Sequence, residues 1–137
     1  MLELQPEYLN KIANQLIIIN SLLGGFSIAV MANLLITKSE GNIGAWLLKV
    51  SILAAAFFLI TVFAMTKIVM MTTEGYPIDF ETSELIFPKI VGFASFVLGI
   101  VSLCALLGLS GWNKSRATGI FSTSVGIVTL VLILLNL

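Results

Sequence analysis

The chain has 137 residues, of which 58% are apolar and 10% are charged, and its mean hydropathy is +1.10. Soluble domains carry about 25% charged residues, and disordered chains combine low hydropathy with a high net charge, so the composition excludes both classes. The net charge is zero, which excludes the basic surface that nucleic-acid binding requires. The chain is therefore expected to be a small integral membrane protein.

Four long stretches without acidic side chains follow one another along the chain, with basic residues near their ends. They predict four transmembrane helices, because a helix needs about 20 mostly apolar residues to cross the hydrocarbon core. The short connectors leave no soluble lobe, so any sensing or effector domain belongs to a separate subunit. We predict an all-α fold, a single four-span domain over residues 1–137, with helices at 12–37, 44–71, 87–110 and 116–136.

Groups that carry chemistry are scarce. The chain has no His and one Cys, which excludes His-ligated metal sites and an internal disulfide. That residue, Cys104, stands in an apolar helix, where packing is its expected role. No Asp or Glu occurs within the predicted spans, whereas proton-coupled carriers need a carboxylate at membrane depth. We expect neither an enzyme nor such a carrier, and no metal or cofactor.

The basic residues do not determine how the chain is oriented in a plasma or inner membrane. The positive-inside rule counts Lys and Arg in the loops rather than net charge. Three of them fall on the side of both termini, and four fall on the opposite side: Lys11, Lys67 and Lys89 against Lys38, Lys49, Lys114 and Arg116. The difference is too small to assign the cytoplasmic side.

Small residues form stripes on the third and fourth predicted helices, at alternating steps of three and four. Small side chains let helix backbones approach closely in lipid, where packing drives helix association. The expected role is packing within the chain, and the alternative is a subunit interface. The stripes are Gly92, Ser95, Gly99 and Ser102 on the third helix, and Gly119, Ser122, Gly126 and Thr129 on the fourth.

The first predicted helix is the most polar and has one distinctive face. With 100° per residue, six positions fall on a stripe about 100° wide, with an Asn near each end and apolar or small residues between. Such a face is suited to a narrow hydrated path with a hydrophobic middle, and the alternative is that the Asn side chains only bond to neighbouring helices. The six residues are Asn14, Ile18, Leu22, Gly25, Ala29 and Asn33.

The run from Asn20 to Asn33 resembles the first, pore-lining helix of the Orai calcium channels, and Asn33 falls where that family has its selectivity glutamate. Shorter matches are Phe63-Ala64-Met65 in the second helix and Trp112 after the third. The resemblance implies a hexamer with the first helix around the axis, and it adds Phe26 to the expected pore lining. Without gaps, the residues shared in the first helix are Leu22, Leu23, Gly25, Phe26 and Met31.

One departure from the family changes the expected selectivity. An amide at Asn33 offers only a carbonyl oxygen, whereas carboxylates bind divalent cations strongly. We therefore predict a pore-forming subunit of a symmetric homo-oligomer with weak selectivity, with Asn33 at one mouth and Asn10 and Asn14 at the other. The expected partners are the lipid bilayer and further copies of the chain. The alternative is a non-conducting accessory or scaffold subunit of a larger membrane complex.

Overall fold

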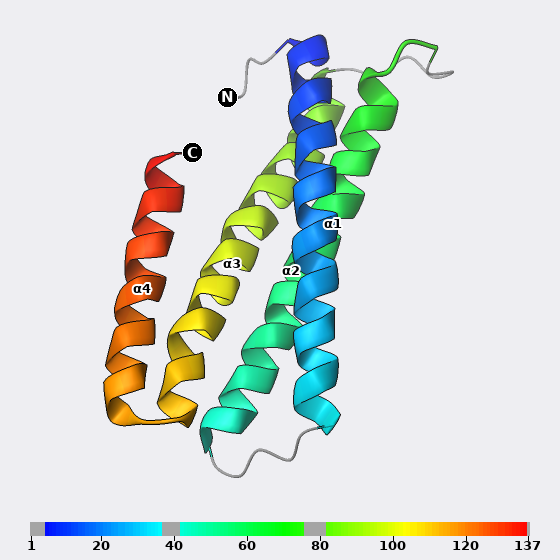
Figure 1. The fold of residues 1–137 in the computed structure, drawn as a ribbon. Coiled ribbons are helices and arrows are strands. Elements are labelled where there is room, and N and C mark those ends of the chain that lie inside the picture. The colour runs from blue at the N-terminus through cyan, green and yellow to red at the C-terminus, as the bar shows by residue number, and fades with distance from the viewer. Residues whose placement is uncertain (1–4, 37–41, 76–81, 137) are drawn as a thin grey trace.

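The computed structural model describes residues 5–36, 42–75 and 82–136. Within these ranges the chain is entirely helical and has no strand (Figure 1). The main helices are α1 (Pro6–Ile36), α2 (Asn42–Thr72), α3 (Ile86–Ser110) and α4 (Arg116–Leu135), with the single turns η1 (Thr82–Leu85) and η2 (Gly111–Asn113). Each of the four long helices is long and apolar enough to span a membrane, which makes the chain a multi-pass membrane protein.

The helix limits follow the charge pattern except at the first helix. α1 begins at Pro6 rather than at residue 12, and its first turn is closed by a bond of 2.9 Å from Leu9 N–H to the Gln5 carbonyl. Proline suits this position because its missing N–H would have no partner in the first turn. The predicted end at residue 37 lies outside the described residues. The limits of α2, α3 and α4 differ from the predicted ones by at most two residues.

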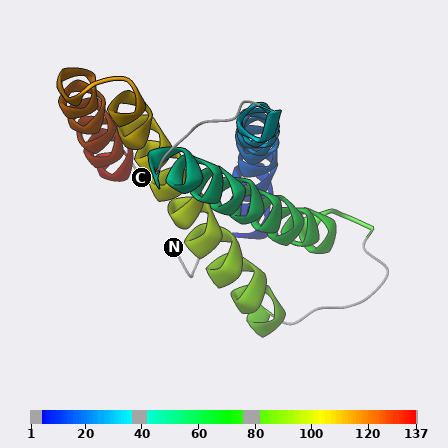
Figure 2. The same ribbon diagram turned by 90° about the horizontal axis from the view of Figure 1, so that it is seen from below.

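The helices pack in chain order as an open array. α1 packs against α2, α2 against α3, and α3 against α4. Among the described residues, α4 makes its main helix contact with α3 alone, and Figure 2 shows that α4 lies beyond α3, away from α1. The chain is therefore not a closed four-helix bundle, and α1 and α4 each have only one extensively covered face.

The core lies where α1, α2 and α3 meet, and Phe58 of α2 is fully buried in it. Glycines on both neighbouring helices face this side chain. A Cβ at Gly24 on α1 would lie 3.4 Å from Phe58 Cβ, and a Cβ at Gly99 on α3 would lie 2.7 Å from its ring atom Cε1. The ring of Phe58 therefore occupies space that a side chain at Gly99 would fill, whereas a Cβ at Gly24 would make an ordinary contact.

The α3–α4 hairpin is held by close backbone approach and hydroxyl contacts. A Cβ at Gly126 would lie 2.9 Å from the carbonyl oxygen of Cys104. Beside it, Ser122 Oγ donates a hydrogen bond of 2.8 Å to the Gly108 carbonyl. Such interhelical bonds together with small-residue contacts are the usual means by which helices associate in lipid. α4 therefore lies directly against the backbone of α3.

The other two glycines of the predicted stripes also lie at contacts. Gly92 on α3 faces the end of the Met65 side chain on α2. Gly119 on α4 lies against the ring of Trp112, in the turn that precedes α4. A side chain at either glycine would overlap its neighbour, so both serve contacts within the single chain.

Candidate functional site

One face of α1 is turned toward the rest of the chain. Its buried positions recur every three or four residues, which places them on a single helical face. Among them, Leu9, Ala13 and Leu16 belong to the core cluster. The two polar members, Asn20 and Ser27, are fully buried on the same face. The opposite face of α1 is consequently left without an intrachain neighbour.

The seven predicted pore-lining residues all lie outside this buried face, and all seven are exposed in the single chain. The exposed fractions of the largest side chains are 70% for Leu22, 60% for Phe26 and 56% for Ile18. A Cβ at Gly25 would have no atom within 4 Å. The structure therefore gathers these positions on an uncovered surface, here called the α1 outer face: Asn14, Ile18, Leu22, Gly25, Phe26, Ala29 and Asn33.

The asparagines of α1 differ in their contacts. Asn10, expected at one pore mouth, donates from Nδ2 to Thr72 Oγ1 at 2.9 Å and to the Val69 carbonyl at 3.2 Å, so it joins α1 to the end of α2. Among the described residues, Asn14 bonds only within α1, to the carbonyl and the side-chain oxygen of Asn10. Asn33 is exposed and makes no side-chain hydrogen bond with another described residue. Asn10 thus has a structural role, while Asn14 and Asn33 remain on the outer face.

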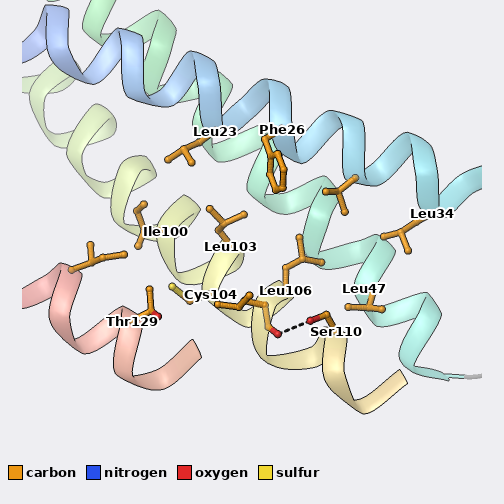
Figure 3. A pocket seen from close by; sticks show the side chains of 13 residues that line it. Leu23, Phe26, Leu34, Leu47, Ile100, Leu103, Cys104, Leu106, Ser110 and Thr129 are labelled. Atoms are coloured by element: carbon orange, nitrogen blue, oxygen red, sulfur yellow. Dashed lines mark hydrogen bonds between the residues drawn. The ribbon is translucent and has the colours of Figure 1, made fainter. Parts of the chain in front are cut away.

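A groove of about 620 Å³ lies beside the outer face, between α1, α3 and α4, with Leu47 of α2 on its wall. Phe26 stands at the boundary between the two surfaces, and Figure 3 shows its ring pointing from α1 into this groove, with Thr129 of α4 on the far wall. The sequence did not reveal the groove. Hydrophobic periodicity describes the faces of one helix, whereas the groove results from the way in which α1 and α4 are placed around α3.

The buried polar residues of α1 are a second feature that the sequence did not locate. Asn20 Nδ2 donates to the Leu16 carbonyl at 2.7 Å, while its Oδ1 has no hydrogen-bond partner among the described residues. Ser27 Oγ donates to the Leu23 carbonyl at 2.8 Å. Both residues therefore face the helix packing rather than the outer face.

The two ends of the molecule differ in charge. At one end, Lys49, Lys114 and Arg116 are exposed, and Lys49 Nζ lies 5.1 Å from the ring centre of Trp46. The described acidic residues, Glu7, Glu74 and Glu84, lie at the opposite end with the other described lysines. The part of the chain that the structure describes has no group of three or more His, Cys, Asp or Glu residues arranged to hold a metal.

No protein-family model matches the chain, and neither does any curated protein or solved structure with which it was compared. The similarity of the Asn20–Asn33 run to the Orai channels thus stays an expectation from a short stretch of sequence. A functional proposal depends on the surfaces that the four helices expose.

Proposed function

We propose that the protein is the pore-forming subunit of a homo-oligomeric ion channel, with α1 of each copy around a central axis. The observation that supports the proposal is the α1 outer face. It is uncovered in the single chain along the length of the helix, and it carries Asn14 and Asn33 near its ends. A face of this kind provides polar mouths and an apolar middle, which is the composition of a pore that gates by dewetting.

The exposed face of α4 can be compared with the α1 outer face. Beyond its first turn, its exposed side chains are aliphatic or aromatic, such as Phe121, Ile127 and Val128, apart from Ser124, whose hydroxyl donates to the Ile120 carbonyl. Such a surface suits contact with lipid tails, where exposed polar groups are costly. The α1 outer face differs because it replaces bulky apolar residues with Gly25 and Ala29 and adds amides near both ends. This difference favours α1 over α4 as the helix that faces an axis.

The sequence predicts a dry constriction of Leu22, Phe26 and Ala29, but the Phe26 ring points into the groove. In the proposed assembly, Leu22, Gly25 and Ala29 therefore form the constriction, and Asn33 forms a ring of amides at one mouth. Neutral amides bind cations less strongly than carboxylates, so we expect conduction with weak selectivity. One chain of four helices is too small to enclose a conduit, and the resemblance to the Orai family implies six copies. The membrane is the plasma or inner membrane.

The alternative function is a non-conducting accessory or scaffold subunit. It is favoured by the short connectors and by the large exposed apolar area of α4. The two functions differ in assembly, since an accessory subunit needs no symmetric ring of its own copies.

The deciding experiment is electron-microscopic imaging of the purified protein in lipid nanodiscs. If the protein is a channel, the images should show a closed ring with one helix per subunit around the axis. In a second measurement, a cysteine introduced at Ala29 should crosslink to its counterpart in the next copy. The control is a cysteine at Val128 on α4, which should not crosslink through the axis. Monomers or dimers without such a ring would contradict the channel and favour the accessory role.

A further inference from the structure

We propose that the groove between α1, α3 and α4 holds an acyl chain of an anionic phospholipid, whose headgroup lies against Lys114 and Arg116. Both cations are exposed. Lys114 lies in the turn that joins α3 to α4, and Arg116 is the first residue of α4. The proposal does not rest on the channel function, because the groove lies beside the α1 outer face and shares only Phe26 with it.

The lining of the groove requires an apolar occupant. The groove extends from Leu23 and Ile100, in the middle of their helices, to Leu34 and Ser110 near the ends of α1 and α3. The Ser110 hydroxyl donates to the Leu107 carbonyl at 2.7 Å, so its proton is already used within α3. Thr129 carries the other hydroxyl of the lining, and ten of the lining residues are aliphatic or aromatic. A polar ligand would therefore replace few of its hydrogen bonds to water, whereas a hydrocarbon chain loses none.

The size and shape of the groove suit a hydrocarbon chain. The segment of α1 from Leu23 to Leu34, which lines the groove, is about 16 Å long, at 1.5 Å per residue. The groove has a volume of about 620 Å³. An acyl chain is thin enough to lie along a groove of this length without separating its walls.

The positive charges at one end of the groove favour an anionic lipid headgroup. Ser110, which lines the groove, is the last residue of α3. The Lys114 N–H donates to the Gly111 carbonyl at 3.1 Å, which keeps Lys114 within about a turn of this end. Arg116 follows as the first residue of α4, and no acidic residue lies at this end among the described residues. Each cation near the membrane surface increases the binding of anionic lipid about fivefold.

The headgroup contact is tested with the purified protein in mixed micelles that contain equal amounts of phosphatidylglycerol and phosphatidylcholine. Native mass spectrometry counts the lipids retained by each subunit. We expect phosphatidylglycerol to be retained about tenfold or more over phosphatidylcholine. The double variant Lys114→Gln/Arg116→Gln should remove this preference. Its matched control, Lys11→Gln/Lys67→Gln at the opposite end, should preserve it.

The acyl-chain contact is tested by filling the groove. Thr129→Phe adds a ring to the groove wall and should reduce retention of both lipids, whereas Val128→Phe, on the exposed face of α4, should not. If Thr129→Phe does not fold, the two charge variants decide the matter, since all their sites are exposed. Equal retention of both lipids by the parent protein would overturn the proposal. An equal loss of lipid preference in both charge variants would also overturn it. So would a Thr129→Phe protein that keeps its lipid but changes its oligomeric state, because the groove would then hold a neighbouring subunit.

Discussion

The ring of Phe58 on α2 lies against the backbone of Gly99 on α3, where a Cβ would be 2.7 Å from the ring atom Cε1. Phe58 is fully buried, and Gly24 of α1 faces it from the other neighbouring helix. In lipid, hydrophobic burial does not distinguish a helix from the surrounding hydrocarbon tails, so packing of this kind has to hold the helices together. The packing of α2 against α3 therefore depends on the glycine at position 99.

Gly99→Leu should lower the stability of the folded chain by about 1–3 kcal/mol or prevent folding, because the added side chain cannot enter a well-packed core without displacing Phe58. The control is Gly25→Leu on the α1 outer face, where a Cβ meets no atom within 4 Å. The midpoint of thermal unfolding in detergent is the measurement. Equal midpoints for the two variants would contradict the packing account.

Gly126→Leu should separate α4 from α3, because a Cβ there already comes within 2.9 Å of the Cys104 carbonyl oxygen. The nearby hydrogen bond from Trp112 Nε1 to Thr123 Oγ1, 2.6 Å long, should be lost with it. Tryptophan fluorescence of a Trp46→Phe background then reports the environment of Trp112. Val125→Leu serves as the control, and an unshifted emission spectrum in Gly126→Leu would refute the prediction.

Asn10→Ala should destabilise the chain by about 0.5–2 kcal/mol, since it removes the bonds from α1 to Thr72 and Val69 at the end of α2. Asn14→Ala, whose parent side chain bonds only within α1, should have a smaller effect. A double-mutant cycle with Thr72→Val measures the coupling between Asn10 and Thr72. A coupling energy of zero would show that this contact does not stabilise the fold.

Leu22→Ser should raise the resting ion leak in liposomes, because a hydroxyl at the constriction helps water to enter it. Leu23 is the next residue, and it packs against the core and lines the groove instead. Leu23→Ser should therefore affect stability more than conductance. An equal leak from both variants, or from neither, would place the pore elsewhere.

The sequence predicted the number of helices and most of their limits, because charges are excluded from the hydrocarbon core and so mark the ends of the spans. It did not predict which helices become neighbours. The partner of Asn10 lies on α2, 62 residues further along the chain, and no periodicity within α1 identifies it. The 100° spacing separates Asn20 from Asn33 on the helix surface, but it could not show that the chain buries the face of Asn20 and leaves that of Asn33 exposed.

Asn33→Glu tests the central claim, that the α1 outer face surrounds an axis. In a ring, the variant brings several carboxylates close together, and two charges about 8 Å apart repel by about 2 kcal/mol at an effective dielectric constant near 20. The ring relieves this repulsion by binding cations, divalent ones most strongly, or by holding protons. Leu35→Glu is the control, because Leu35 is exposed but lies about 160° around the helix from Asn33, outside the α1 outer face.

The measurement is the reversal potential of both proteins in liposomes, with and without calcium. The account predicts that Asn33→Glu increases cation selectivity, introduces block by micromolar to millimolar calcium, and loses that block at low pH as the carboxylates become protonated. A well-assembled Asn33→Glu protein with the selectivity of its parent and no calcium block would remove Asn33 from the pore and contradict the channel function.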